Sequence, residues 1–164
     1  MSKTVKPREY RLPKLRGGNL ALVYNHAHEV ILSAGADVGK TWACCVKSLI
    51  LCTDPDRPNV HGALCRKVRA TMEQSVVRTF RTILAGLPVR RVGGQTTERF
   101  LFPNGSEIVV VGLDAPEKLL SSEWDFVQVC QTEELSEGDW ELLYGVDDTL
   151  YWERGSRNVR DSLP

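Results

Sequence analysis

Residues 34–41 read AGADVGKT, and this stretch decides the fold: Ala34, Gly35, Ala36, Asp37, Val38, Gly39, Lys40 and Thr41. The apolar run at residues 29–33 precedes it, and residues 42–50 follow it with the composition of an apolar helix. A strand, a tight loop and a helix in this order are the context of a phosphate-binding loop. The alternative is an ordinary strand-to-helix turn that happens to contain Gly-Lys-Thr, and the pattern on both sides favours the phosphate loop.

The residue types of this loop fit the chemistry of a nucleoside triphosphate. Small residues allow the backbone N–H groups from Gly35 to Thr41 to curl around an anion. The helix that begins there points its positive end at the phosphates. Lys40 can reach the β- and γ-phosphates, and the Thr41 hydroxyl can hold Mg²⁺. The sequence therefore predicts that residues 34–41 bind Mg-ATP.

The composition indicates one domain with a substantial core. The chain has 164 residues, of which 42% are hydrophobic. Its 21 basic and 21 acidic residues balance. This balance disfavours a nucleic-acid-binding protein whose whole surface is basic, but it allows a local basic face. No apolar run is long enough to span a membrane, and the basic N-terminus lacks the apolar core of a signal peptide. We therefore expect a cytoplasmic protein.

The cysteines are expected to be buried, reduced thiols. Most of them lie in apolar runs, their number is odd, and no Cys-x-x-Cys spacing occurs. Metal binding or thiol catalysis is the alternative, but no histidine lies in register with them as a ligand would. The five are Cys44, Cys45, Cys52, Cys65 and Cys130.

Positive charge is concentrated between residues 66 and 91, where seven basic residues accompany a single acid, Glu73. A solvated helix face and a contact with a polyanion are equally good interpretations of this segment. The candidate contacts to double-stranded DNA are Arg66, Lys67, Arg69, Arg78 and Arg81. Arg66 has a second interpretation, because it stands at the carboxyl end of an expected strand and could act within the nucleotide site.

Expected strands and helices alternate along the chain. The apolar patterns predict strands at 29–33, 60–66, 99–102, 107–111 and 125–130. They predict helices at 40–52, 69–85, 114–121 and 136–144. Pro103-Asn104-Gly105-Ser106 should close a hairpin, and Ser136 should cap the last helix. We expect a loosely ordered leader at 1–20, the P-loop domain at 21–145 and a tail of unclear structure at 146–164.

This alternation predicts an α/β fold, namely a P-loop NTPase with a mainly parallel sheet and helices on both faces. Ligands bind beyond the carboxyl ends of the strands in such sheets. The loop at 34–41 and the end of the strand at 125–130 should therefore lie in one crevice. A nucleotide hydrolase needs a carboxylate there, to act on Mg²⁺ or on the attacking water.

The strand at 125–130 ends without the usual carboxylates. In the Walker B pattern an Asp-Glu pair directly follows four apolar residues, and here Cys130 and Gln131 occupy those two places. The nearest carboxylates are Glu133 and Glu134, which are the candidates for orienting the attacking water, with Glu134 preferred. The alternative is that both glutamates only lead into the next helix.

These segments, taken in order, resemble the ATPase domain of the large terminase subunit of tailed bacteriophages. The resemblance rests on the loop, on LCRK followed by QSV, on the FPNGSEI hairpin, on GLDAPEKL and on the acidic EELSEGDW turn, and it spans residues 28–143. It implies a RecA-like motor that hydrolyses Mg-ATP to push double-stranded DNA into a capsid in the host cytoplasm. It also implies a ring of identical subunits, a portal protein and a small terminase subunit as partners, and a nuclease domain after the ATPase.

Three features depart from the pattern of that family. Many members have an arginine in the loop where this chain has Ala36, and Cys130 and Gln131 replace the Asp-Glu pair. The residues after Trp140 do not resemble the family's later strand or its nuclease, so we expect a sheet that is incomplete at the C-terminus. The resemblance nevertheless implies catalysis by Glu134 or Glu133 together with Lys40.

Two other functions remain open. One is a different P-loop enzyme, either a helicase-like ATPase or a small nucleotide kinase, although no clear lid with arginines is found for a kinase. The other is a nucleotide-binding remnant that does not hydrolyse ATP, because the residues at the Walker B position carry no carboxylate.

Overall fold

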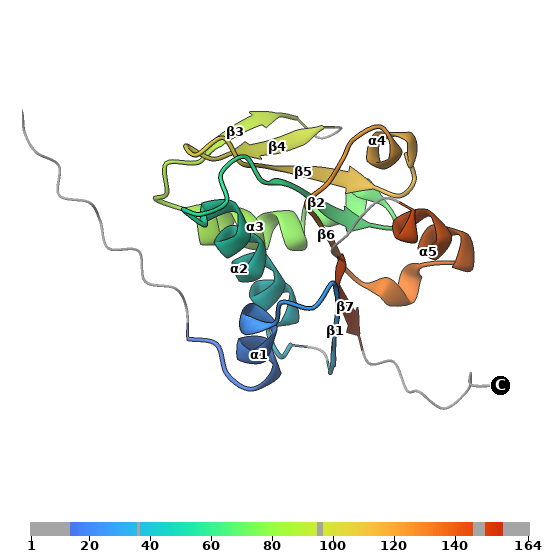
Figure 1. The fold of residues 1–164 in the computed structure, drawn as a ribbon. Coiled ribbons are helices and arrows are strands. Elements are labelled where there is room, and N and C mark those ends of the chain that lie inside the picture. Colours follow the sequence, from blue (N-terminus) through green and yellow to red (C-terminus); the bar gives the residue numbers. More distant parts are fainter. Residues whose placement is uncertain (1–13, 36, 95–96, 146–149, 156–164) are drawn as a thin grey trace, which may run out of the picture.

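The computed structural model describes residues 14–35, 37–94, 97–145 and 150–155, which form one seven-stranded sheet with helices around it (Figure 1). The strands are β1 (Glu29–Ala34), β2 (His61–Arg66), β3 (Arg90–Gly93), β4 (Glu98–Leu101), β5 (Glu107–Gly112), β6 (Phe126–Val129) and β7 (Leu150–Gly155). Their order across the sheet is β1-β7-β6-β2-β5-β4-β3. The pairs from β1 to β5 are parallel, and β4 and β3 extend the sheet in antiparallel fashion.

Helices cover both faces of this sheet, as predicted. They are α1 (Gly18–Tyr24), α2 (Lys40–Thr53), α3 (Val76–Leu84), α4 (Glu117–Leu120) and α5 (Glu137–Tyr144), with short 3₁₀ turns η1 (Arg69–Met72) and η2 (Thr132–Glu134). The buried residues of α1, α2 and α3 share one core with one face of the sheet. Those of α4 and α5 share a second core with the other face.

Alternating side chains of the central strands supply the two cores. On β2, Leu64 belongs to the core beneath α2 and α3, whereas Ala63 and Cys65 belong to the core beneath α4 and α5. On β5, Val110 and Val111 divide in the same way. Successive side chains of a strand point to opposite faces, so a parallel strand covered on both sides is apolar throughout. The continuous apolar runs seen in the sequence therefore mark the middle of the sheet.

The hairpin predicted between residues 99 and 111 is confirmed as β4 and β5. Its turn contains Gly105 with a φ of 87°, which glycine adopts without steric cost. The Asn104 side chain donates a hydrogen bond to the Cys52 carbonyl at 2.9 Å, and this joins the turn to the end of α2. The predicted cap of α5 is confirmed too, because Ser136 and Asp139 form a reciprocal capping box.

The helix predicted at 69–85 is divided into two elements. The expected apolar positions from Met72 to Leu84 are buried, but the chain forms η1, breaks at Ser75 and continues as α3. The Ser75 hydroxyl donates to the carbonyl of Thr71 at 2.9 Å and lies 3.3 Å from that of Met72. Such local bonds compete with a regular helix. The pattern is therefore right about the buried face and wrong about the continuity of the helix.

Three elements have no counterpart among those predicted: α1, β3 and β7. α1 begins at Gly18, inside the leader expected to be loosely ordered, of which residues 1–13 lie outside the described part. β3 contains Arg90 and Arg91 and pairs with β4. β7 lies between β1 and β6 and pairs with both in parallel. The segment after Trp140 thus does supply a strand, which corrects the expectation that the later strand is missing.

All five cysteines are buried free thiols, as predicted. Burial raises the pKa of the Cys52 thiol, and the nearby charge of Asp125 raises it further. Burial alone raises the pKa of Cys65. Because the thiolate is the reactive form of cysteine, these two side chains act as packing residues.

Candidate nucleotide-binding site

The loop between β1 and α2 contains two residues with a left-handed backbone. Asp37 and Gly39 have φ values of 58° and 78°, both in the left-handed region. Turns of this kind direct neighbouring backbone N–H groups toward one side of the chain and create a concavity for anions. Glycine adopts this conformation freely, whereas a non-glycine residue such as Asp37 does so at a cost that functional loops often bear. Ala36 lies outside the described residues.

The ammonium group of Lys40 lies inside this loop. Nζ donates to the carbonyl oxygens of Ala34 at 2.9 Å and Gly35 at 2.6 Å, and the residue is only 8% exposed. Neutral carbonyls are weaker partners for a cation than charged phosphate oxygens. Lys40 could therefore exchange these carbonyls for the oxygens of a phosphate bound in the loop. Thr41 follows as the second residue of α2, at the helix end whose dipole favours anions.

Helix α1 supports the loop from within the expected leader. The Asn19 side chain donates from Nδ2 to the Val38 carbonyl at 2.6 Å. Farther along α2, Nζ of Lys47 donates to the carbonyls of Val23 and Asn25 at 2.9 and 2.7 Å. Burial lowers the pKa of Lys47. This support was not predicted, although the apolar run LALVY at residues 20–24 was an available helix signal.

The chain turns sharply after β6, at Gln131. This residue has φ 55° and ψ 58°, a left-handed conformation that is uncommon outside glycine. The Cys130 N–H just before it still donates to the Cys65 carbonyl at 2.9 Å, so the turn begins beside β2. The buried Oε1 atom of Gln131 has no hydrogen-bond partner among the described residues. The residues after this turn form η2, where the Glu134 N–H donates to the Gln131 carbonyl.

This turn directs Glu134 toward the central strand β2. Its carboxylate accepts two hydrogen bonds from Arg66, from Nε to Oε2 at 3.0 Å and from Nη2 to Oε1 at 2.6 Å. The Arg66 side chain is 12% exposed and that of Glu134 is 32% exposed. Glu133, the other candidate, is exposed on η2, as Glu134 is. The pair with Arg66 joins Glu134 to the neighbouring strand β2.

The phosphate loop and the Glu134 turn share one edge of the sheet, as predicted. β7 pairs in parallel with β1 and β6, so all three strands have their carboxyl ends at the same edge. The register sets Val129 of β6 beside Trp152, and Trp152 beside Ile31 of β1. η2 contacts β7, the strand next to β1. This edge of the sheet is the candidate nucleotide site.

Most of the basic cluster proposed for DNA forms ion pairs within the chain. Arg66 pairs with Glu134, and Arg78 is exposed on α3. A cation that already pairs with a carboxylate contributes less to binding a polyanion than an exposed cation without such a pair does. The other pairs are Lys67–Asp139 at 2.5 Å, Arg69–Glu98 at 3.4 Å, Arg81–Glu98 at 2.8 Å and Arg81–Glu73 at 2.5 Å.

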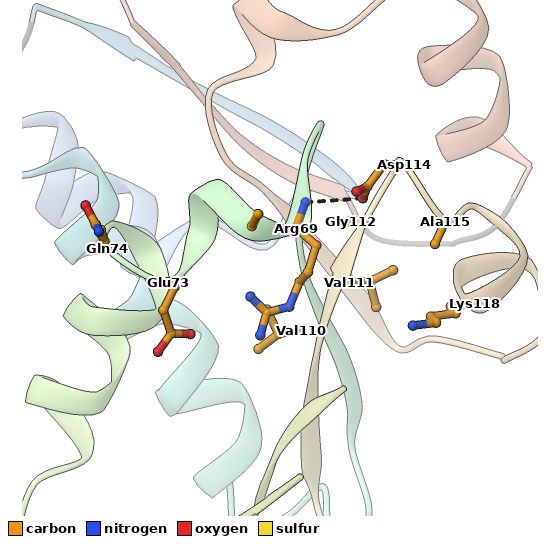
Figure 2. Close-up of a pocket in the computed structure, with 10 residues that line it drawn as sticks. Arg69, Glu73, Gln74, Val110, Val111, Gly112, Asp114, Ala115 and Lys118 are labelled. Carbon is orange, nitrogen blue, oxygen red and sulfur yellow. Dashed lines mark hydrogen bonds between the residues drawn. The ribbon is translucent and has the colours of Figure 1, made fainter. Parts of the chain in front are cut away.

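A cavity of about 540 Å³ lies at the carboxyl end of β5 (Figure 2). Arg69 and Glu73 line it from η1 and the turn after it, and Asp114 and Lys118 line it from the segment after β5. The chain is tightly packed here, because a Cβ on Gly112 would lie 2.6 Å from the Arg69 backbone nitrogen. β7, β6 and β2 stand between this cavity and the phosphate loop after β1. It is therefore separate from the candidate nucleotide site.

Within the described ranges, no group of three or more His, Cys, Asp or Glu side chains is arranged to hold a metal ion. Mg²⁺ at nucleotide sites is usually bound by one or two protein groups, by water and by the phosphates themselves. Thr41 at the start of α2 fits that role without such a cluster. No helix in the described part of the chain is long and apolar enough to cross a membrane.

No protein-family model matches this sequence, and no curated protein is significantly similar to it. Several solved structures are similar in fold. The large terminase of a thermophilic bacteriophage gives a TM-score of 0.70 with 10% identity, over 83% of this chain and 38% of that protein. The ATPase domain of a Thermus phage large terminase gives 0.63 with 15% identity, over 90% and 67%. The Phi-28 gp11 DNA packaging motor gives 0.50 with 12% identity, over 87% and 50%.

The chain therefore has the RecA-like P-loop fold of phage large terminase ATPase domains, and the resemblance seen in the sequence is confirmed at the level of the fold. It spans 38% of the length of the first of these terminases. A structure of that same terminase in complex with ADP is also similar, with a TM-score of 0.67.

Proposed function

We propose that this chain is the ATP-binding and ATP-hydrolysing part of a phage DNA-packaging large terminase. The observation that carries the proposal is the loop between β1 and α2, where Asp37 and Gly39 are left-handed and the Lys40 ammonium lies inside. The similarity in fold to large terminase ATPase domains, including one solved with ADP, supports it.

ATP would bind with its phosphates in this loop. The backbone N–H groups from Gly35 to Thr41 would cradle the β- and γ-phosphates. Lys40 would exchange its two carbonyl partners for phosphate oxygens. The Thr41 hydroxyl would be a ligand of Mg²⁺, which when bound neutralises charge that develops on the phosphates.

Glu134 would orient the water that attacks the γ-phosphate in line. It is the carboxylate that the turn after β6 brings to the central strand, through Arg66. Cys130 and Gln131 carry no carboxylate, so neither replaces it. Gln131 can contribute a hydrogen bond to the same water, as a glutamine does in some GTPases. Glu133 is the second candidate for the role of Glu134.

In an intact motor this hydrolysis would drive the movement of double-stranded DNA. The similarity to the Phi-28 gp11 DNA packaging motor supports that context. The motor would be a ring of identical subunits in the host cytoplasm, together with a portal protein and a small terminase subunit. Arg78 and the less exposed cations near it would supply contacts to the DNA backbone.

A second candidate function is nucleotide binding without hydrolysis. The specific observation in its favour is that Cys130 and Gln131 stand where a P-loop hydrolase normally carries its carboxylates. A helicase-like ATPase is a further alternative that the same phosphate loop would serve.

Release of inorganic phosphate from Mg-ATP separates these functions. We expect slow but measurable turnover in the parent protein and a loss of about 100-fold or more in Glu134→Gln, since positioned acid–base groups contribute 10²–10⁴-fold. Glu141→Gln, an exposed change on α5, is the matched control and should keep the parental rate. A parental rate in Glu134→Gln together with a loss in Glu133→Gln would assign the role to Glu133. No turnover in a folded protein that binds Mg-ATP would favour the binding function.

A further inference from the structure

The cavity at the carboxyl end of β5 lies between two loops that are tied together (Figure 2). The Asp114 carboxylate, after β5, accepts a hydrogen bond from the Arg69 backbone N–H at 3.2 Å, which is the dashed line in Figure 2. The Leu113 N–H donates to the Arg66 carbonyl of β2 at 3.0 Å. Gly112 permits this close approach, because a Cβ there would collide with the Asp114 carboxylate. The walls of the cavity are therefore fixed relative to each other.

Arg69 brings a recessed cation to this cavity. The residue is only 9% exposed, and its guanidinium lies between Glu73 and the β5 side chain Val110 in Figure 2. Its Nε atom is buried and has no hydrogen-bond partner within the part of the chain that the structure describes. Nη2 pairs with Glu98 at 3.4 Å, which is longer than an ordinary hydrogen bond. The guanidinium thus has donor capacity that the described chain does not use.

Glu98 is already occupied by two other arginines. Its side chain is completely buried. Arg81 donates to its two oxygens from Nε at 3.0 Å and from Nη2 at 2.8 and 2.9 Å. Arg91 lies 2.6 Å from Oε1. A carboxylate offers about four acceptor positions on its two oxygens, so Arg69 receives only a weak share of this carboxylate.

The charges around the cavity leave Arg69 without full compensation. The second carboxylate nearby, Glu73, accepts a hydrogen bond from Arg81 at 2.5 Å. Among the described side chains, this cluster therefore joins three guanidinium groups to two carboxylates. Asp114 and Lys118, the other charged residues of the lining, add one charge of each sign. A buried cation without a full partner is costly, so the surplus favours an anion beside Arg69.

The size and the lining of the cavity suit a small organic molecule. Its volume of about 540 Å³ lies within the range of about 300–1,000 Å³ that is typical of ligand pockets. Val110, Val111 and Ala115 line it together with Arg69, so an apolar body can pack beside the guanidinium. A DNA duplex reaches an exposed cation such as Arg78 more easily than a recessed one. The cavity therefore favours a free anion as its occupant.

We propose that this cavity binds a small organic anion, whose carboxylate or phosphate group pairs with Arg69 and whose apolar body packs against β5. Arginine presents its donors as a planar fork that matches the oxygens of both groups. The anion supplies the negative charge that the cluster around Glu98 lacks. The inference does not rest on the proposed function, because β7, β6 and β2 separate this cavity from the phosphate loop.

Ligand-observed NMR titration of the full chain with benzoate tests this site. Benzoate is a carboxylate with a planar apolar body, and a ligand of this size should bind with a dissociation constant on the order of 1 mM. Inorganic phosphate should displace it, because both anions use Arg69. Benzamide has the same shape without the charge. It should bind at least about tenfold more weakly, since charge-assisted hydrogen bonds are the stronger ones.

Three variants locate the binding. Arg69→Met keeps an apolar stem but removes the guanidinium, and it should weaken benzoate binding at least about tenfold. Ala70→Phe leaves Arg69 in place and fills the cavity from an exposed position on η1, so it should abolish saturable binding. Arg99→Met removes an exposed arginine that faces Glu107 at 3.6 Å, and this matched control should keep the parental affinity. Urea unfolding shows which variants are folded.

Four results would overturn the proposal. They are an absence of saturable benzoate binding in the folded parent, equal affinity for benzamide, parental affinity in folded Arg69→Met, and displacement of benzoate by a short DNA duplex at lower concentration than by inorganic phosphate. The last result would assign the site to the DNA backbone. If Arg69→Met does not fold, parental affinity in Ala70→Phe would overturn the proposal instead. All of these results leave the proposed nucleotide site intact.

Discussion

The Ser48 hydroxyl of α2 lies 2.5 Å from Oε1 of Gln128 on β6, and both side chains are fully buried. The first of these residues lies on the helix that begins at the phosphate loop, and the second lies on the strand that leads to Glu134. This hydrogen bond therefore fixes the spacing between the two halves of the candidate site. In the sheet, β7 lies between β1 and β6. The hydrogen bond links the two halves across this separation because α2 crosses over the sheet.

Ser48→Ala should destabilise the fold by about 1–3 kcal/mol, because it leaves the buried Gln128 oxygen without its donor. Ser48→Ala combined with Gln128→Leu should recover most of this loss, since replacing both polar partners by apolar groups can be nearly neutral. Urea unfolding measures both. Equal stability of the parent and Ser48→Ala would show that the hydrogen bond does not form.

Gln131→Glu should raise the rate of ATP hydrolysis if the turn after β6 is a Walker B site that has lost its carboxylate. The change adds a carboxylate at the place where P-loop hydrolases carry one, near the water that Glu134 would orient. Phosphate release at saturating Mg-ATP checks this prediction. An unchanged or lower rate, with the fold retained, would mean that the left-handed turn points this side chain away from the water.

Binding to double-stranded DNA should be independent of sequence and should weaken steeply with salt, because phosphate contacts release counterions. Most cations of the cluster face carboxylates, so Arg78 should contribute most. Arg78→Gln should reduce the slope of log affinity against log salt by about one. Arg57→Gln, an exposed arginine 3.9 Å from Asp125 at the opposite edge of the sheet, should leave the slope unchanged. Salt-independent affinity in the parent would contradict the DNA contact.

Asp139 should contribute stability that is lost in acid. Burial opposes its ionisation, but the hydrogen bonds from Lys67 and from the side chain and backbone of Ser136 prevail and hold its pKa below the ordinary value of 3.8. The unfolded chain therefore takes up the proton first as pH falls. The contribution is complete well above pH 3.8 and disappears as pH falls through the lower pKa of the folded state.

Asp139→Asn tests this linkage. The parent should exceed the variant in free energy of unfolding at neutral pH, and the difference should shrink only below about pH 4. A difference that is already lost near pH 6, or one that grows in acid, would contradict the assignment.

The phosphate loop and the hairpin could be predicted because their signals are local. The loop is one run of residues between an apolar strand and an apolar helix, and Pro103-Asn104-Gly105-Ser106 consists of residue types that favour turns. The buried cysteines and the apolar face of α3 follow from short periodic patterns in the same way.

The missed features depend on partners far away in the sequence. β7 reads LYWERG, and its charged residues interrupt the apolar pattern expected of a strand that pairs on both sides. Arg90 and Arg91 of β3 read as part of a basic patch, but Arg91 pairs with the buried Glu98 at 2.6 Å. The link between Arg66 and Glu134 needs the left-handed turn at Gln131, which no local pattern indicates.

The proposed function depends most on the phosphate loop, and calorimetric titration with Mg-ATP tests this loop most directly. The parent should bind, and Lys40→Ala should bind at least about tenfold more weakly, because a hydrogen bond to a charged group contributes about 1.5–3 kcal/mol. Lys118→Ala, a lysine change of the same kind beside β5, should keep the parental affinity, and circular dichroism should show all three folded. Parental affinity in a folded Lys40→Ala would contradict nucleotide binding by the phosphate loop.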